Sequence, residues 1–345
     1  MRIFITGGAG FIGCNMAAHH LAKGRHVTLY DNLSRLRTEH NLGWLRDEAP
    51  HGDGASLQFI RGDTRDFDAL REAVRDSRPD LIVHLAAQVA VTTSVRNPRE
   101  DFEINALGTF NVLEAARLQE RPPAVFYAST NKVYGGMEDV VVVPAGARYV
   151  YRDLPKGVTE HQPLDFHSPY GCSKGAGDQY VRDYSRIYGL RTVVFRQSAI
   201  YGPRQFGVED QGWLAHFIIA AVTGRPINIY GDGRQVRDML HVSDLIRAYE
   251  LAWTHINKVS GEVFNLGGGS TNTMSIWTEC GPMLEALKGE SIPVRHGEWR
   301  PGDQLVCVMD YSKAAAILGW QPIVGIREGI QQLWTWVAAN RELFD

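Results

Sequence analysis

A tyrosine and a lysine, Tyr170 and Lys174, stand one helical turn apart in the stretch Tyr-Gly-Cys-Ser-Lys. Ser168 is a suitable N-cap and Pro169 suits a first helical position, so we predict a helix from residue 168 to about 188, where Gly189 ends it. Both side chains then share one face. A phenol normally titrates near pH 10, and a neighbouring ammonium lowers that pKa. The pair could therefore exchange a proton with a substrate hydroxyl, although this spacing alone is a frequent coincidence on amphipathic helices.

A glycine-rich turn gives that pair a context. Gly7, Gly10 and Gly13 follow an apolar run at the start of the chain and precede a predicted helix. Glycines there allow a sharp turn and let a pyrophosphate approach the helix N-terminus. Asp31 ends the next predicted strand about 20 residues later, where an acid binds the adenosine ribose and repels the extra phosphate of NADP. The two motifs together predict NAD and hydride transfer from a substrate carbon, and the positive nicotinamide would also lower the pKa of Tyr170.

Two further stretches fit this cofactor. Asp63 follows the third predicted strand, where its carboxylate could accept a hydrogen bond from the adenine amine. Residues 85–87 end the fourth strand with two alanines, as a backbone lying along a cofactor requires. Helix capping or tight packing stays open as an alternative for each. The residues predicted to bind the cofactor are Gly7, Gly10, Phe11, Ile12, Gly13, Asp31, Asn32, Ser34, Arg35, Asp63, Thr64, Leu85, Ala86, Ala87, Gln88, Asn105, Ser129, Tyr170 and Lys174.

The elements that must position these residues alternate along the first half of the chain. Apolar runs predict strands over residues 3–5, 26–30, 57–60, 81–85, 124–128, 192–195 and 263–266. Helical stretches over residues 12–23, 67–77, 102–118 and 168–188 lie between them, and another over 326–337 closes the chain. This alternation predicts an α/β fold with a doubly wound parallel sheet, the Rossmann arrangement, and a smaller C-terminal substrate-binding lobe. We expect a cofactor domain over residues 1–200 with returning segments near 235–268, and a substrate lobe mainly over 201–345.

Residues 136–163 interrupt the alternation, and we expect a substrate lid, a small edge hairpin or a packed surface excursion there. The bulk composition is that of an ordinary enzyme. The chain has 345 residues and a formal net charge of −3, which does not favour nucleic acid or anionic membranes. Its four cysteines lack metal-ligand spacing, so we predict no metal site and reduced thiols in the cytoplasm. We also expect no signal peptide and no transmembrane helix.

Three more motifs lie in the second half, namely Tyr-Gly-Pro-Arg at 201–204, Arg-Asp-Met-Leu-His-Val-Ser-Asp at 237–244 and Arg-Pro-Gly-Asp at 300–303. With the motifs above, the chain resembles the extended short-chain dehydrogenase/reductase superfamily, whose members include NAD-dependent nucleotide-sugar epimerases and dehydratases. The resemblance covers essentially the whole chain. It implies that Thr130 hydrogen-bonds the reacting oxygen and that Arg237 and Arg300 bind the substrate diphosphate, a task for which the arginine fork is suited. A surface ion pair is the alternative for each arginine.

The resemblance also narrows the reaction. Dehydratases of the family carry an Asp-Glu pair directly after this threonine, and decarboxylating members carry a Glu, whereas this chain has Asn131 and Lys132. Elimination and decarboxylation are therefore disfavoured, and oxidation followed by re-reduction, an epimerisation, remains. Residues 129–135, 167–180 and 204–213 are most similar to carbon-2 epimerases of CDP-sugars, of the CDP-paratose to CDP-tyvelose type. Ala199 stands where many members have a substrate-binding Asn, which indicates a rebuilt sugar pocket.

The resemblance thus implies a nucleotide diphosphate sugar substrate, CDP-linked, and an enzyme that is a homodimer or higher homo-oligomer through helices near 102–118 and 170–188. Three alternatives stay open: a 4-epimerase of UDP- or GDP-sugars, a net NAD-dependent sugar oxidoreductase, and a non-catalytic NAD sensor. The predicted catalytic residues are Tyr170, Lys174 and Thr130. The residues expected to bind substrate are Thr130, Asn131, Lys132, Ser198, Arg204, Arg237 and Arg300.

Overall fold

A computed structural model describes residues 1–300 and 303–344, so Pro301 and Gly302 of the predicted Arg-Pro-Gly-Asp motif lie outside the described residues. Contacts divide the chain into two compact units. The first unit comprises Met1–Val133, Phe166–Arg196 and Ile246–Phe264, and the second comprises Tyr134–Asp165, Gln197–Leu245 and Asn265–Asp345. The assignment of one domain to the cofactor and another to the substrate stays a prediction.

A seven-stranded sheet in the order β12-β8-β5-β4-β1-β2-β3 is the centre of the first unit. Every predicted strand of this sheet is confirmed, with ends that differ by one or two residues. The strands are β1 (Arg2–Thr6), β2 (His26–Asp31), β3 (Ser56–Arg61), β4 (Leu81–His84), β5 (Ala124–Thr130), β8 (Thr192–Gln197) and β12 (Glu262–Leu266). The pairs β1–β2, β1–β4, β2–β3 and β4–β5 are parallel, and their near-continuous apolar runs are typical of strands covered on both faces.

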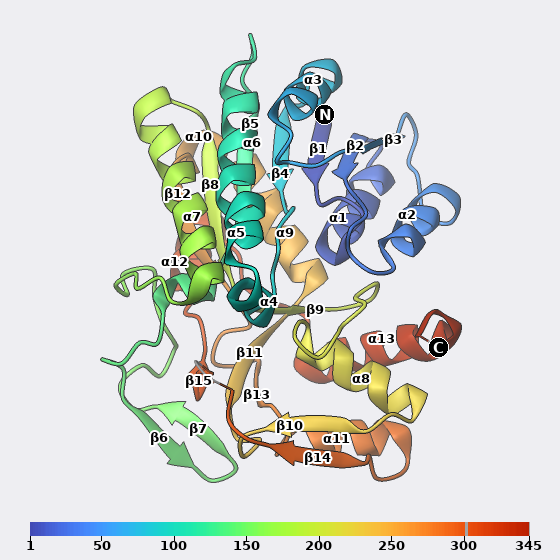
Figure 1. The fold of residues 1–345 in the computed structure, drawn as a ribbon, viewed down its shortest axis with the longest axis vertical. Coiled ribbons are helices and arrows are strands. Elements are labelled where there is room, and N and C mark those ends of the chain that lie inside the picture. The colour runs from blue at the N-terminus through green and yellow to red at the C-terminus, as the bar shows by residue number, and fades with distance from the viewer. Residues whose placement is uncertain (301–302, 345) are drawn as a thin grey trace. The chain divides into compact units, whose positions relative to one another are not determined.

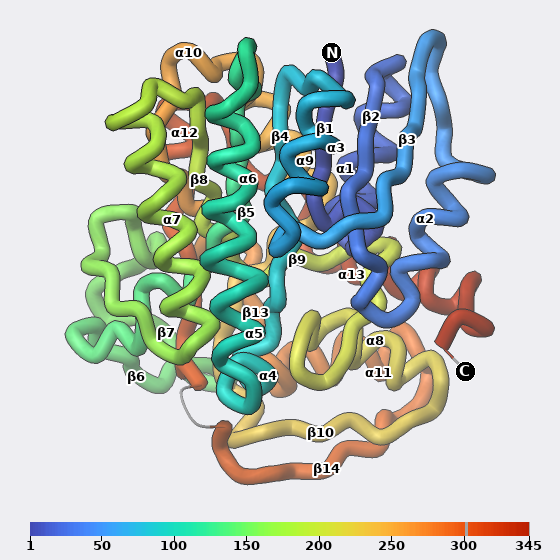
Figure 2. The backbone as a smooth tube through the Cα atoms, turned by 45° about the horizontal axis from the view of Figure 1, so that its top comes forward, coloured from blue at the N-terminus to red at the C-terminus, as the bar shows by residue number. Residues whose placement is uncertain are grey.

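Helices cover both faces of this sheet, as right-handed crossovers in two opposite directions from β1 require. Figures 1 and 2 show α3, α6 and α7 side by side along the sheet. The helices of the first unit are α1 (Phe11–Ala22), α2 (Thr38–Asp47), α3 (Phe67–Ser77), α4 (Val91–Arg96), α5 (Pro98–Phe102), α6 (Gly108–Arg117), α7 (Ser168–Tyr188) and α10 (Ile256–Val259). Helix α9 (Val242–Thr254) runs from the second unit into the first. Apolar side chains of the strands and of α3, α6 and α7 form one buried core.

The predicted long helix over residues 102–118 is present, begins earlier at Pro98, and contains one π-helical turn. This turn, η1 (Glu103–Leu107), separates α5 from α6, while a 3₁₀ turn, η2 (Asn131–Tyr134), follows β5. Isolated π-helical turns within helices are frequent at functional sites. The turn η1 carries the buried Asn105, whose side chain is described with the site below.

The second unit is a mixed assembly around β11 (Val236–His241), which pairs antiparallel with β13 (Thr273–Ser275) and parallel with β9 (Ala199–Tyr201) and β15 (Val306–Cys307). Strands β10 (Ile227–Tyr230) and β14 (Val294–Gly297) form a separate parallel pair. The helices are α8 (Trp213–Thr223), α11 (Cys280–Lys288), α12 (Ser312–Leu318), α13 (Ile326–Ala339) and the 3₁₀ turn η3 (Arg341–Phe344). Ile330, Leu333 and Val337 of α13 are buried in the core of this unit, as their helical spacing predicted.

The interrupting segment forms the hairpin that was one of the sequence-based expectations. Strands β6 (Val142–Ala145) and β7 (Arg148–Tyr151) pair antiparallel. Arg148 forms an ion pair with Glu279 at 2.7 Å, and Arg234 donates a hydrogen bond to the Gly146 carbonyl at 2.7 Å. The hairpin is therefore fixed to the rest of the second unit by charged contacts. Among the described residues, no helix combines the length and the apolar composition needed to cross a membrane.

Candidate active site

Helix α7 carries the predicted acid/base pair on a buried face. The Ser168 hydroxyl accepts a hydrogen bond from the Gly171 amide at 3.2 Å, so this serine caps the first turn as its sequence position predicted. Its backbone has a positive φ of 65°, a conformation that is uncommon for a residue with a side chain. At the other end Gly189 adopts φ 66° and ends the helix. Both Tyr170 and Lys174 are buried.

The helix packs directly against β5. A Cβ added to Gly177 would lie 2.4 Å from the Tyr127 hydroxyl, so only glycine permits this approach. That hydroxyl donates to the Lys174 carbonyl at 3.2 Å. The Lys174 ammonium lies 4.2 Å from the centre of the Tyr127 ring, within range of a cation–π interaction. The position of the lysine is thus set by the backbone packing of α7 on β5.

Thr130, at the end of β5, meets the tyrosine. The side chains of Thr130 and Tyr170 are hydrogen-bonded. The Thr130 hydroxyl also donates to the Asn131 side-chain oxygen at 3.1 Å and accepts from the Lys132 amide at 3.3 Å. The structure therefore brings the three predicted catalytic residues together in the first unit, with Asn131 next to them.

The electrostatics of the protein alone differ from the expected direction. Burial raises the pKa of Tyr170 to about 12, although its hydrogen bond with Thr130 lowers it. Burial also lowers the pKa of Lys174 to about 7, against the opposing effect of Asp178 and Asp101. The reason is that a buried site disfavours both charged forms, the phenolate and the ammonium. The expected lowering of the tyrosine pKa is therefore not found in the protein alone.

Asp178 lies one turn beyond Lys174 and belongs to a buried ion pair that the sequence analysis did not single out. Its carboxylate accepts from the Arg196 guanidinium at two positions, each 2.9 Å, and both side chains are almost fully buried. The Ser129 hydroxyl also donates to it at 2.7 Å. The side chain of Ser129, which was predicted to bind the cofactor, therefore forms a hydrogen bond within this network.

A second buried network joins α7 to α5 and to the loop after β4. The Asp101 carboxylate accepts from Ser173 through a short hydrogen bond and from Gln88 at 2.8 Å. Asn105 donates from its amide to Asp101 at 3.1 Å, to Ser173 at 3.1 Å and to the Gln88 carbonyl at 2.9 Å. Two predicted cofactor residues, Gln88 and Asn105, therefore hold the loop and the helix together. The signal that was missed is the aspartate one helical turn before Asn105.

The glycine turn fits a dinucleotide. A Cβ on Gly7, which has φ 68°, would lie 2.7 Å from the Ala86 amide nitrogen, and a Cβ on Gly13 would lie 2.3 Å from the Gly7 carbonyl oxygen. In the described part of the chain, no side chain caps helix α1 at Gly10 and no acidic residue lies in its first turn. The amides of Phe11 and Ile12 at this helix start suit an anion such as pyrophosphate.

The loops after β2 and β3 surround the two predicted acids. The Asp31 carboxylate accepts from the Ala9 amide at 3.0 Å and the Leu33 amide at 2.8 Å. The Asp63 carboxylate accepts from the Asn32 side chain at 2.8 Å and forms an ion pair with Arg65, whose hydrogen bond lowers the pKa of Asp63 to about 2. Both acids thus hold their loops in place through hydrogen bonds. An adenine amine bound to Asp63 would share this carboxylate with Asn32 and Arg65.

The other predicted cofactor residues lie on the same unit. Ser34 and Arg35 are exposed in the loop after β2, and the Ser34 amide donates to the Asn32 side chain at 2.9 Å. Thr64 is buried, and its carbonyl accepts from Asn111 at 2.9 Å. Leu85, Ala86 and Ala87 follow β4, where the amides of the first two donate to the Thr6 hydroxyl.

The remaining predicted substrate residues belong to the second unit. Arg237 forms an ion pair with Asp303 at 2.6 Å, and Arg300 lies 4.0 Å above the Tyr230 ring, close to Asp210 at 3.6 Å. The Ser198 hydroxyl donates to the buried Asp238 carboxylate. Arg204 lies over the Trp336 ring at 5.8 Å. The ion-pair alternative considered for both arginines thus occurs in the protein alone, and a diphosphate would compete with these acids.

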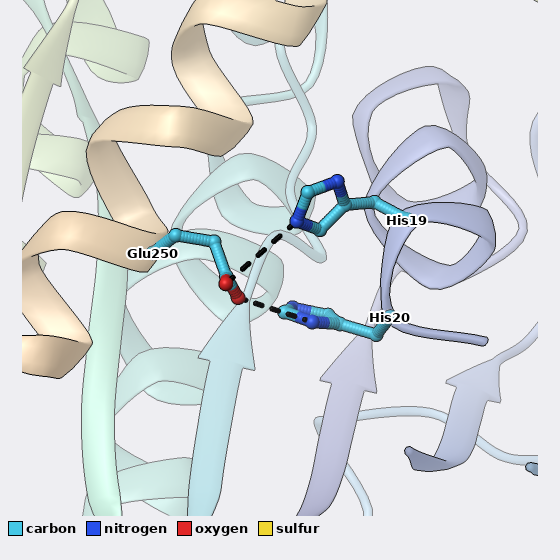
Figure 3. A group of neighbouring side chains, drawn as sticks. All are labelled: His19, His20 and Glu250. Carbon is cyan, nitrogen blue, oxygen red and sulfur yellow. Dashed lines mark ion pairs between the residues drawn. The ribbon is translucent and has the colours of Figure 1, made fainter. Parts of the chain in front are cut away.

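Figure 3 shows a separate cluster, His19 and His20 of α1 with Glu250 of α9. Histidine nitrogens and a carboxylate are common metal ligands. Here, however, Lys23 donates to Glu250 at 2.7 Å, and Arg25 donates both to that carboxylate and to the His20 Nδ1 atom, the latter at 2.8 Å. A metal ion would lie beside two cations, so the cluster is an ion-pair network that joins α1 to α9.

Comparison with known proteins places this geometry in a family. The model of the NAD dependent epimerase/dehydratase family matches residues 3–267. The chain is 42% identical to the CDP-paratose 2-epimerase of Salmonella typhi, over 98% of this chain and 100% of that protein. Among solved structures, the UDP-glucose 4-epimerase of Thermotoga maritima with UDP-glucose has a TM-score of 0.84 at 29% identity, covering 100% of both chains. The NAD complex of the Thermus thermophilus UDP-glucose 4-epimerase has a TM-score of 0.82 at 32% identity, covering 99% of this chain and 100% of that one.

The match to the family model spans most of the chain, including the glycine turn, Thr130, Tyr170 and Lys174. The resemblance seen in the sequence is thereby confirmed. The chain belongs to the NAD dependent epimerase/dehydratase family.

Proposed function

We propose that this protein inverts carbon 2 of a CDP-linked sugar, in the manner of a CDP-paratose to CDP-tyvelose conversion. The observation that carries the oxidation and re-reduction is the buried Tyr170, hydrogen-bonded to Thr130 and one turn from Lys174 on α7. Asn131 and Lys132 follow Thr130, where the related dehydratases carry an acid pair. The similarity to the Salmonella typhi CDP-paratose 2-epimerase over nearly the full length of both chains supports the carbon-2 assignment.

Each side chain of the site has its own role in the proposed reaction. Bound NAD would supply reversible hydride transfer at carbon 2 of the sugar. The Tyr170 oxygen takes the hydroxyl proton of carbon 2 and later returns it. Thr130 orients that hydroxyl through its own hydroxyl. Lys174 supplies a positive charge near the tyrosine, which favours the phenolate.

The glycine turn supports the assignment of the cofactor residues. We propose that the amides at the start of α1 bind the pyrophosphate and that Asp31 binds the adenosine ribose. The close approach of Gly7 to Ala86 leaves no room for a larger side chain where the cofactor would lie. Asp63, Thr64 and residues 85–88 would line the remainder of the cofactor.

The positive charge of two arginines indicates which residues bind the substrate diphosphate. We propose that Arg237 and Arg300 bind the diphosphate. We propose that Arg204 and Ser198, which belong to the same unit, also bind the substrate. Each of the first two arginines already lies beside a carboxylate, so phosphate oxygens would replace carboxylate oxygens as acceptors. We propose that Asn131 and Lys132 bind the sugar.

The test is NMR of the products formed by purified protein without added cofactor from CDP-paratose and from CDP-, UDP- and GDP-glucose. Inversion at carbon 2, fastest with a CDP-sugar, is the expected result. Inversion at carbon 4 would keep the oxidation and re-reduction but identify a 4-epimerase. NADH release would identify a net oxidoreductase. Bound NAD with no conversion of any of these sugars would contradict the epimerase proposal and favour a sensor.

We further propose that the protein is a homodimer. Exposed apolar side chains gather on α5, η1, α6 and α7, which form one helical surface of the first unit; they are Phe102, Leu107, Phe110, Leu118, Tyr180, Ile187 and Tyr188. Exposed apolar patches of this kind are characteristic of protein interfaces. The four cysteines, all free thiols, support our proposal of a cytoplasmic location.

Light scattering after gel filtration tests the assembly. The variant Tyr180→Lys places a charge in the apolar surface, so we expect it to shift the protein to monomers. The control Ile323→Lys changes an even more exposed apolar residue of the second unit and should leave a dimer. A monomeric wild type, or equal effects of both variants, would contradict the proposed interface.

A further inference from the structure

Asp101 is a buried carboxylate bonded to neutral groups. It is 1% exposed, and its hydrogen-bond donors are Ser173, Gln88 and Asn105, which come from α7, the loop after β4 and η1. Among the ion pairs of residues 1–300 and 303–344, none includes Asp101. A buried carboxylate costs free energy unless a positive charge or sufficient hydrogen bonds stabilise it. Burial raises the pKa of Asp101, and the hydrogen bonds from Ser173 and Gln88 lower it.

The positive charge that acts on this carboxylate is Lys174, which follows Ser173 directly in α7 and lowers the pKa of Asp101 against the raising effect of burial. Three other groups act on or touch the lysine, and Tyr170 shares its helix face. The Tyr127 ring lies under the ammonium, Asp178 is one turn away, and the buried His84 is neutral at neutral pH.

The two carboxylates near this lysine are not equivalent. Asp178 is bound by the Arg196 guanidinium on both of its oxygens, and it still raises the pKa of Lys174 more than Asp101 does. Asp101 has no such cation. Its neighbours Glu100 and Glu103 are partly exposed, accept hydrogen bonds from Asn97 and Arg99 respectively, and are partly screened by water.

We propose that Asp101 is a positioning residue that fixes α7 to the loop after β4 through Ser173 and Gln88, and that together with Asp178 it supplies negative charge acting on the buried Lys174. The inference rests on the proposed function of the Tyr170 and Lys174 pair. It assigns the π-helical turn a role as well, because η1 brings the Asn105 amide to the same carboxylate.

The sign of the effect distinguishes this role from simple packing. A negative charge favours the protonated forms of both neighbours, so Asp101 raises the pKa of Lys174 and also that of Tyr170. Loss of the charge makes both groups lose their protons at lower pH. The whole pH profile of turnover should then move to lower pH, whereas a merely loosened site would lose rate without this shift.

The experiment compares Asp101→Asn with Ser173→Ala. The first variant removes the charge, and the second removes a hydrogen bond but keeps the charge. Purified protein with its bound cofactor is labelled with [ε-¹³C]lysine, and the resonance of Lys174, one of seven lysines, is assigned with Lys174→Met. We expect Asp101→Asn to lower the titration midpoint of Lys174 by about one pH unit and Ser173→Ala to leave it nearly unchanged.

The pH profile of epimerisation is measured on the same samples and should shift to lower pH only in Asp101→Asn. An unchanged lysine midpoint in that variant would overturn the inference, even if activity is lost. If Asp101→Asn does not fold, Asp101→Ser removes the same charge and serves in its place. The lysine titration does not require turnover, so it can be measured even if the wild type epimerises none of the sugars. The failure of the proposed function and the failure of this inference can therefore be told apart.

Discussion

Tyr170 combines burial, a hydrogen bond to Thr130 and proximity to Lys174 in a single side chain. In the protein alone, burial holds its pKa at about 12, far from the range in which a phenol exchanges protons readily. We infer that the site reaches its working state only when charges bind beside the tyrosine. The low pKa of Lys174, about 7, means that its own charge depends on the surrounding carboxylates.

The variant Tyr170→Phe tests the acid/base role. We expect turnover to fall by roughly 10³-fold, within the range contributed by a positioned acid/base group, while bound NAD stays at the wild-type amount. Product NMR gives the rate, and the absorbance of the released nucleotide gives the cofactor content. Near wild-type turnover in this variant would refute the assignment.

The Asp178–Arg196 pair supports the helix from within the core. We expect Asp178→Asn to lower the free energy of unfolding by about 3 kcal/mol, because it leaves a buried guanidinium without its counter-charge. The matched control is Asp76→Asn, whose partner Arg75 is on the surface, and it should leave stability unchanged. Urea unfolding of both variants measures the difference, and equal midpoints would show that the buried pair contributes no more than the exposed one.

At the scale of elements, the turn between β1 and α1 depends on the absence of side chains. The Cβ of an alanine at Gly13 would lie 2.3 Å from the Gly7 carbonyl oxygen and 2.7 Å from the Gly8 Cα atom, and neither backbone atom can move without displacing the turn. We therefore expect Gly13→Ala to lower the amount of NAD that co-purifies by at least roughly tenfold, a loss of about 1.4 kcal/mol of binding.

The control for this prediction is Gly43→Ala in α2. No atom lies within 4 Å of a Cβ added there, and alanine is the better helix former by about 1 kcal/mol. This variant should retain NAD and be slightly more stable. If both variants retain NAD equally, the close approach at Gly13 has no consequence for the cofactor.

At the scale of the whole molecule, two buried histidines predict instability in mild acid. Burial lowers the pKa of His20 and of His84 to about 3 each. In the unfolded chain a histidine binds a proton near pH 6.5, so between pH 6.5 and 3 the unfolded state holds protons that the folded state does not. Stability therefore falls as the pH falls through this window. Glu250, whose pKa is lowered despite burial by hydrogen bonds from His19, Arg25 and Lys23, adds a loss only at lower pH.

We expect the free energy of unfolding to drop by roughly 2 kcal/mol per histidine between pH 7 and pH 5. Urea midpoints at the two pH values measure this loss. The variant His84→Gln has no titrating group at that site, so it should lose only about half as much on acidification, whatever its stability at pH 7. An equal loss in the variant and the wild type would exclude His84 as a source.

The sequence by itself determined what depends on neighbours along the chain. Apolar runs identified the strands of the large sheet, and the glycine spacing identified the turn between β1 and α1. The positions of Tyr170, Lys174 and Thr130 next to strand and helix signals identified a site that the structure assembles. These features are readable because the period of a strand or helix and the conformational freedom of glycine are local properties. The family motifs carried the assignment to nucleotide-sugar enzymes.

Only the tertiary structure decided which distant groups meet. Asp101 reaches Ser173 across 72 positions, and Asp178 meets Arg196 on another element. The predicted helix over 102–118 contains the π-helical turn η1, where Asn105 contacts both Asp101 and Ser173. The acids beside Arg237 and Arg300 were equally hidden in the sequence. Such contacts follow from how helices pack on a sheet, and the burial that results shifts each pKa by an amount that no local pattern contains.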